Sequence, residues 1–169
     1  IGYGGKHISN LRLWQAEPIE QFDFNLFDSG KYEKCVTDKN RAEDISRVLY
    51  PNDSGTAGKV LRLRQQYFLV SAALQNIVNT YGLDDIENKI KIQLNDTHPV
   101  LAIPEFINIC VKQNMGFDSA LMLCAKIFAY TNHTVMPEAL EKWNEDLFRL
   151  KLPRIYSYTE DRVKQLVKE

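Results

Sequence analysis

The stretch IQLNDTHPVLAIPEF, residues 92–106, decides the fold. An apolar run stops at Asn95, four polar or turn-forming residues follow as far as His98, and Pro99 then introduces a segment with helical spacing. A short apolar run that leads through a polar loop into an amphipathic segment is typical of a strand–loop–helix unit. We therefore expect a strand at 90–94 and a helix at 100–113.

A second unit of the same kind follows. A helix is expected at 118–127, with Asp118 as its N-cap after Gly116, and it leads into a strand at 127–131. The loop TNHTVMP, 131–137, then runs into a helix expected at 137–149, which Pro137 would open. Two strands joined through helices in this way lie parallel, with a right-handed crossover.

This topology brings two polar loops to one edge of a sheet. Loops that leave the carboxyl ends of parallel strands share an edge, and ligands of open α/β sheets bind there. The polar residues concerned are Asn95, Asp96, Thr97, His98, Asn132, His133 and Thr134. They suit a site that forms many hydrogen bonds to a polar ligand. The alternative is that they only cap helices and form turns.

Composition excludes several classes of partner. The 169-residue chain has a net charge of −1, so it lacks the basic character of proteins that bind nucleic acid or an anionic membrane. No apolar run approaches the roughly 18 residues of a membrane span, and no signal peptide is visible. The three cysteines lack metal-ligand spacing and are expected to be buried and reduced in a cytoplasmic protein. Because the chain opens with Ile1, we expect a piece of a longer protein.

The other expected elements follow from local pattern. They are a strand at 10–14 (NLRLW), a loop at 17–30, a helical region from Tyr32 to Leu49 divided near Asp38, a loop at 50–58, a long helix from Lys59 to Tyr81 ended by Gly82, and a last helix from about Ser157 to Lys168.

Specific catalytic motifs are scarce. Asp96, His98 and His133 could bind a metal in principle, but no paired helical spacing supports them, and no metal is expected. No nucleophile elbow appears, and GYGG, 2–5, lacks the pattern of a phosphate-binding loop. The segment 50–58 is a turn cluster by composition; the functional alternative is a mobile gate with Gly55 and Gly58 as hinges.

Six strings nevertheless resemble one family, in the order in which that family carries them. They are LRLW (11–14), AEDISRVLYPND (42–53), GKVLRLRQQYF (58–68), IQLNDTHPVLAIPE (92–105), AYTNHTVMPEALEKW (129–143) and LPR (152–154). They closely resemble the α-glucan phosphorylases, which act on glycogen, starch or maltodextrin. The resemblance covers nearly the whole chain.

The resemblance implies a pyridoxal 5'-phosphate enzyme that cleaves terminal α-1,4-linked glucose with inorganic phosphate and yields glucose 1-phosphate. Family members have a two-domain glycosyltransferase fold with the site between two Rossmann-like domains. The chain, residues 1–169 as a single segment, is similar to the later part of the N-terminal domain, a helix-rich α/β unit with part of a parallel sheet. The C-terminal domain with the cofactor lysine is absent from it, so the segment alone is expected to be inactive and to hold no catalytic residue.

Site residues are carried over by position. His133 resembles the residue that binds the glucose primary hydroxyl, with Thr134 beside it, and Asp96 and His98 lie in a loop that lines the cleft. The gate loop over the site would contain Tyr50, Asn52, Asp53 and Ser54, with Arg62 just beyond it. The helix at about 38–49 resembles the tower helix that packs across the family's homodimer interface.

Some features depart from the animal members of the family. Asn79 and Thr80 stand where those enzymes carry an arginine pair for an activating phosphate, and the connection 81–89 is short. Both features are similar to microbial enzymes without nucleotide or phosphorylation control. The gate segment SGTAGK lacks the animal enzymes' aromatic residue, and the tail from Ser157 diverges. Two alternatives stay open: a nucleotide-sugar-dependent glycosyltransferase of the same fold, and a non-catalytic assembly fragment.

Overall fold

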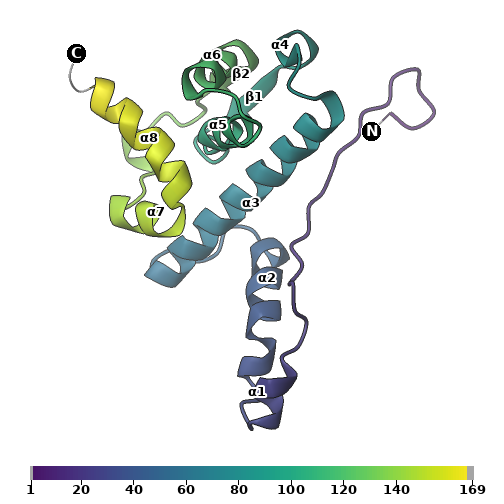
Figure 1. The fold of residues 1–169 in the computed structure, drawn as a ribbon, viewed down its shortest axis with the longest axis vertical. Helices are drawn as coiled ribbons and strands as arrows, with labels where there is room; N and C mark the ends of the chain where they lie inside the picture. Colours follow the sequence, from purple (N-terminus) through teal and green to yellow (C-terminus); the bar gives the residue numbers. More distant parts are fainter. Residues whose placement is uncertain (1, 167–169) are drawn as a thin grey trace.

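The computed structural model describes residues 2–166, which form a helix-rich α/β unit with one two-stranded parallel sheet (Figure 1). In chain order the elements are α1 (Phe24–Asp28), the 3-10 helix η1 (Lys34–Val36), α2 (Thr37–Arg47), α3 (Thr56–Tyr81), α4 (Ile86–Lys89), β1 (Ile92–Asn95), α5 (Ala102–Lys112), α6 (Phe117–Ile127), β2 (Phe128–Thr131), the 3-10 helix η2 (Pro137–Ala139), α7 (Glu145–Lys151) and α8 (Pro153–Leu166).

The sheet confirms the predicted parallel pair. β1 and β2 pair in register from Ile92 opposite Phe128 to Asn95 opposite Thr131, with α5 and α6 between them in the chain. Asp118 was expected to be the N-cap of α6, and this is wrong. Gly116 takes the extended cap conformation, and Asp118 lies in the first turn of the helix. A carboxylate in the first turn still favours the helix dipole.

The core lies between α3, α5, α6 and the sheet. Its buried apolar side chains include Leu74 and Val78 of α3, Phe106 of α5 and Ile127 of α6. Figure 1 shows α3 running diagonally beneath α5 and α6, with α7 and α8 beside its first half. The predicted helix 59–81 is confirmed and begins three residues earlier, and Gly82 ends it with a φ of 70°. Cys35, Cys110 and Cys124 are buried and free, as expected.

An arm projects from this body; we use that name for α1, η1 and α2, residues 24–47 (Figure 1). The segment 17–30 was expected to be a loop, which is wrong for α1: the Asp23 side chain caps this helix by accepting from the Leu26 N–H at 3.0 Å. The division of 32–49 falls between η1 and α2, one residue before Asp38. α2 ends at Arg47, because Val48 is extended and its carbonyl accepts from the Gln65 side chain.

The strand expected at 10–14 is absent. The alternation of leucine with polar or amphipathic residues is typical of a strand, but a strand also needs a neighbour to pair with. Within residues 2–166 the sheet contains only β1 and β2. The segment instead runs extended along α3, where Arg12 donates to Asn76 Oδ1 at 2.5 Å, and it leaves Leu11 and Leu13 exposed.

The helix expected at 137–149 is also wrong as a single element. Pro137 opens only the 3-10 turn η2, and a new helix, α7, begins after Asn144, whose side chain accepts from the Leu147 N–H. Between them the chain is not helical, and Glu141 reaches α3 instead. α8 begins at Pro153, four residues before the predicted start; the predicted end at Lys168 lies outside the described residues.

The loop expected at 50–58 extends only to Gly55, because α3 begins at Thr56. Gly58 is therefore a helical residue, and it is required by a close approach rather than as a hinge. A Cβ added to it would lie 1.8 Å from the Asn52 carbonyl oxygen, which leaves no room for a side chain. Across the described helices, none combines the length and apolar character needed to cross a membrane.

Candidate functional site

The two polar loops meet at one edge of the sheet, as the topology predicted. Asp96 directly follows β1, and its N–H donates to the Thr131 carbonyl at the end of β2 with an N–O distance of 2.8 Å. Asp96 has a φ of 61°, in the left-handed region that few residues other than glycine occupy. This backbone turns the carboxylate of Asp96 toward the second loop.

The Asp96 carboxylate fixes that second loop. Its Oδ1 accepts the His133 N–H at 2.7 Å and the Thr134 hydroxyl at 3.4 Å. The His133 Nε2 lies 3.4 Å from Asn95 Oδ1, so the imidazole is held over the end of β1. The ring remains exposed and accessible to a ligand. Asp96 therefore positions His133 and Thr134 rather than projecting freely from its loop.

A second cluster surrounds His98, two residues beyond Asp96. Arg62 of α3 lies at its centre, with its Nη2 3.5 Å from His98 Nδ1 and its Nη1 3.7 Å from Asp53 Oδ2. The guanidinium also sits 5.7 Å from the centroid of the Tyr50 ring. Tyr50 meets the His98 ring edge to face, with 6.1 Å between the ring centroids.

Glu141 completes this cluster, and sequence reasoning missed it. Its Oε1 accepts from Arg62 Nε at 2.9 Å and from Gln66 Nε2 at 2.8 Å, and its Oε2 lies 3.7 Å from His98 Nδ1. Only 12% of the Glu141 side chain is exposed. The prediction placed it within a helix at 137–149. The available signal was the spacing of Arg62 and Gln66, which puts two donors on one face of α3.

The tautomer of His98 decides the role of its Nδ1 toward Arg62. A ring that carries its hydrogen on Nε2 can accept from Arg62 through Nδ1, whereas a hydrogen on Nδ1 would face Arg62 and Glu141 Oε2, which is 3.7 Å away. The Arg62–Glu141 pair is mostly shielded from water, with 20% and 12% of the side chains exposed. Breaking such a pair is more costly than breaking a surface one.

The predicted site residues thus divide into two linked clusters and two outliers. The first cluster holds Asp96, His133 and Thr134; the second holds Tyr50, Asp53, Arg62 and His98. Asn52 accepts from the Ser54 N–H at 3.0 Å within their own turn, and both residues are exposed.

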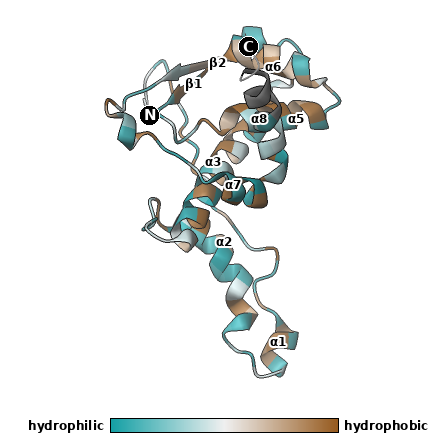
Figure 2. Ribbon diagram, turned by 90° about the vertical axis from the view of Figure 1, so that its left-hand side faces the viewer, coloured by the Kyte–Doolittle hydropathy of each residue, from teal (hydrophilic) through white to brown (hydrophobic). Residues whose placement is uncertain are grey.

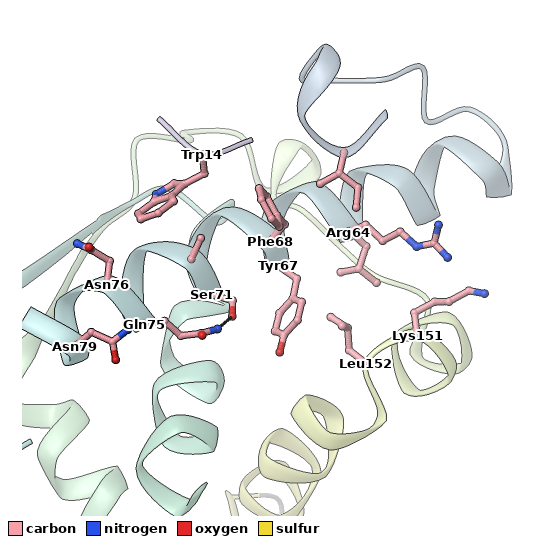
Figure 3. Close-up of a pocket in the computed structure, with 13 residues that line it drawn as sticks. Trp14, Arg64, Tyr67, Phe68, Ser71, Gln75, Asn76, Asn79, Lys151 and Leu152 are labelled. Carbon is pink, nitrogen blue, oxygen red and sulfur yellow. Dashed lines mark hydrogen bonds between the residues drawn. The ribbon is translucent and has the colours of Figure 1, made fainter. Parts of the chain in front are cut away.

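Two cavities are possible locations for a ligand. A pocket of about 150 Å³ lies against the second cluster and is lined by residues that include Tyr50, Arg62 and His98. A groove of about 620 Å³ lies elsewhere, along α3 between Trp14 and Leu152 (Figure 3). None of the predicted site residues lines that groove. We place the site at the loops because the oriented polar groups gather there.

Chemically, the loops offer carboxylate, amide, hydroxyl, imidazole and guanidinium groups. Within residues 2–166 no group of three His, Cys, Asp or Glu side chains is arranged to hold a metal ion. The polar side chains of the two loops are hydrogen-bonding groups of the kind that suit a ligand with many hydroxyls. The fold and the candidate site together define an α/β protein with a polar edge at the carboxyl ends of two parallel strands.

Comparison with known proteins identifies the family. The sequence profile described as "Phosphorylase: Carbohydrate phosphorylase" matches residues 1–169, so the chain belongs to the carbohydrate phosphorylase family. It is 48% identical over 159 residues to the glycogen phosphorylase of Chlamydia pneumoniae, covering 90% of this chain and 19% of the relative. It is 42% identical over 184 residues to the human liver form of glycogen phosphorylase, covering 98% of this chain and 22% of the relative.

A yeast relative gives the same result. The chain is 46% identical over 159 residues to the glycogen phosphorylase of Saccharomyces cerevisiae, covering 90% of this chain and 18% of that protein. The chain therefore spans about a fifth of the length of the curated relatives it matches.

Proposed function

We propose that the protein carrying this chain is an α-1,4-glucan phosphorylase, which transfers the terminal glucose of a glucan to inorganic phosphate and releases glucose 1-phosphate. The observation that carries the proposal is the full-length match of the chain to the carbohydrate phosphorylase family. Three relatives named glycogen phosphorylase support the choice of glucan over other carbohydrates.

In this proposal the chain contributes to sugar binding. The exposed His133 ring binds a glucose hydroxyl, and Asp96 holds the ring in place through the His133 N–H and the Thr134 hydroxyl. His98, Arg62 and Glu141 line the neighbouring wall, and the loop with Tyr50, Asn52, Asp53 and Ser54 acts as a gate. An ordered loop lowers the entropic cost of binding, because its side chains are already placed.

The two loop clusters do not offer the group that pyridoxal phosphate needs. The cofactor needs a lysine amine to bond its aldehyde. Within residues 2–166, the hydrogen bonds and ion pairs described above for the two loop clusters include no lysine. We therefore assign the cofactor to the part of the protein outside this chain. We also propose that the whole protein has a two-domain glycosyltransferase fold with Rossmann-like halves, and that it is a cytoplasmic enzyme.

The arm supports a proposal about assembly. α2 has no buried residue, and the rest of the arm exposes aromatic side chains that include Phe24 and Tyr32. We propose that the arm packs against a second copy in a homodimer. Light scattering on the protein that carries the chain should give twice the monomer mass; a monomer at high concentration contradicts this proposal.

The sugar-binding role is tested with His133→Ala in the protein that carries the chain. Loss of a specific polar contact typically costs on the order of 1–3 kcal/mol, and here it should lower kcat/KM for glucan phosphorolysis with little change in melting temperature. His7→Ala is the matched control, because His7 is also exposed and lies far from the loops in sequence. Unchanged efficiency beside a lowered melting temperature would assign His133 a structural role only.

Asp96 gives a graded version of the same test. Asp96→Asn keeps an oxygen that can accept the His133 N–H, so it should impair the enzyme less than His133→Ala. Asp96→Ala removes the acceptor and should free the second loop. Glucose 1-phosphate formation from maltodextrin and phosphate is the assay, and its absence in the wild-type protein would reject the proposed function.

A further inference from the structure

A buried carboxylate lies between α3 and α5, outside both loop clusters. Glu105, in the first turn of α5, is 1% exposed. Its Oε2 accepts from the Tyr67 hydroxyl at 2.8 Å and from Asn108 Nδ2 at 3.0 Å, and its Oε1 accepts from the Ser71 hydroxyl at 2.7 Å. A charge is costly to bury, and these three donors offset part of that cost.

The cluster is tied to α3 rather than to a cation. Two of its three donors, Tyr67 and Ser71, are four residues apart on the same face of α3. Ser71 also accepts from Gln75 at 2.8 Å, one turn further on, and Figure 3 shows this bond on the α3 face that carries Tyr67. Within residues 2–166, Glu105 takes part in none of the ion pairs that the structure shows. Burial and the Glu105 carboxylate raise the pKa of Tyr67, so its hydroxyl stays a donor.

α3 also carries Arg62 of the second loop cluster, and α5 begins shortly after its His98. Gln66, next to Tyr67, and Arg62, just over one turn earlier, both donate to Glu141. α5 follows directly from the loop that holds His98, and Glu105 lies seven residues after that histidine. A shift of α3 along α5 would therefore move Arg62 relative to His98, which lie 3.5 Å apart.

We propose that Glu105 is a positioning residue: by binding Tyr67 and Ser71 it sets the register of α3 against α5 and so places Arg62 and Gln66 on the sugar-binding wall. Packed apolar surfaces alone tolerate small sliding movements. Two directional hydrogen bonds, from Tyr67 and Ser71 of α3 to Glu105 of α5, restrict them. The inference rests on the proposed function for its kinetic consequence, but its structural part does not.

The test is a double-mutant cycle between Tyr67→Phe and Arg62→Ala in the protein that carries the chain. Tyr67→Phe keeps the ring and removes one donor, so the fold is retained. We expect it to lower kcat/KM for phosphorolysis about fivefold to tenfold, and to lower it less than about twofold when Arg62 is already alanine. Effects that simply multiply overturn the proposal, because independent action needs no link through Arg62.

Val78→Ala is the control for general destabilisation. Val78 is buried in the apolar core near the other end of α3, and it should lower the melting temperature without changing kcat/KM. An equal loss of efficiency in Val78→Ala and Tyr67→Phe would show that any weakening of α3 has this effect, and would overturn the specific role of Glu105. Glu105→Gln, which keeps the side-chain volume but replaces one acceptor oxygen with a donor group, should resemble Tyr67→Phe in its coupling to Arg62.

Failure of the proposed function gives a different result. If the wild-type protein forms no glucose 1-phosphate from glucan, the phosphorylase assignment is rejected. The double-mutant cycle is then measured by the melting temperatures of the variants instead of by kcat/KM. Non-additive shifts for Tyr67→Phe and Arg62→Ala then support the structural link between the cluster and the wall. Additive shifts overturn it.

Discussion

The arm and the body of this chain are both helical, but they are stabilised in different ways. In the body, α3, α5 and α6 bury a continuous apolar core around Phe106 and Ile127. α2 in the arm buries no residue and is largely hydrophilic along its length (Figure 2). It relies instead on ion pairs between neighbouring turns, such as Arg47 with Glu43. Helical pattern alone therefore says little about stability.

This difference has an energetic consequence. Isolated helices of fewer than about 12–15 residues are marginal in water, and exposed ion pairs contribute only about 0.3–0.5 kcal/mol each. α2, with 11 residues, therefore depends on its junction with α3 and on whatever packs against it. The body is expected to unfold as one cooperative unit, whereas the arm is expected to open at lower cost.

The largest expected effect sharpens this comparison in the body. Phe106 is 0% exposed, and Phe106→Ala should lower the free energy of unfolding by about 3–5 kcal/mol. Phe24→Ala is the matched control in the arm, where Phe24 is 76% exposed and should cost far less. Denaturant unfolding of the two variants measures the difference. Equal losses would mean that the arm and the body share one core.

The buried thiols extend the comparison to pH. Burial raises the pKa of Cys110 to about 11 and that of Cys124 to about 12, from an ordinary value of 9.0. Below pH 9 both thiols are protonated in the folded and the unfolded chain, so their contribution is fully present. As pH rises further, only the unfolded chain loses the protons, and stability falls by about 1.4 kcal/mol per pH unit for each thiol.

This loss continues until the pH reaches the folded-state pKa of each thiol. Unfolding measured from pH 8 to 11 should show the decline in the body signal, and Cys124→Ala should reduce its slope. A slope unaffected by that substitution would show that other groups cause the alkaline loss. Both thiols belong to the apolar core of the body, so the effect should appear first in the body rather than in α2.

The junction of the two regions should show an intermediate effect. Gln65 is 3% exposed, and its Nε2 donates to the carbonyls of Val48 at 2.8 Å and Asp44 at 3.2 Å. Gln65→Ala leaves these carbonyls without that donor, which costs about 1–3 kcal/mol. Hydrogen exchange should become faster in α2 while the body amides keep their protection. Gln113→Ala, at an exposed position, serves as control.

The same contrast explains what the sequence could predict. The parallel pair and α3 follow from apolar periodicity, because periodicity reports burial, and burial is what stabilises the body. The segment 10–14 has a strand pattern but no strand partner among the described residues. The helix at 137–149 was wrong because Glu141 binds Arg62 and Gln66, which are distant in sequence. α1 was missed although it had a local signal: Asp23 is a suitable N-cap, but it lies within an acidic and aromatic stretch that was interpreted as a loop.

In the candidate site, too, the sequence could predict some residues and not others. Topology alone brought Asp96 and His133 to one edge, because both follow parallel strands. It could not give the direction of their contact, in which the carboxylate accepts a backbone N–H. Glu141 and the buried Glu105 cluster depend on how helices pack, and a carboxylate in a helical pattern looks like an exposed charge until its partners are known.

The smallest expected effect is in the arm and is the most sensitive to salt. Arg47 pairs with Glu43 at 2.7 Å and with Asp44 at 3.0 Å, and all three side chains are more than a third exposed. Arg47→Ala should therefore lower α2 stability by only a few tenths of a kcal/mol at low ionic strength. At about 1 M salt the Debye length falls to about 3 Å, so the difference from wild type should nearly vanish. Hydrogen exchange in α2 at both salt concentrations measures it, with Arg41→Ala as a control whose single pair to Asp38 is longer, at 3.4 Å. A large, salt-independent loss would mean that Arg47 does more than pair with its neighbours, and that the arm has a packed interface of its own.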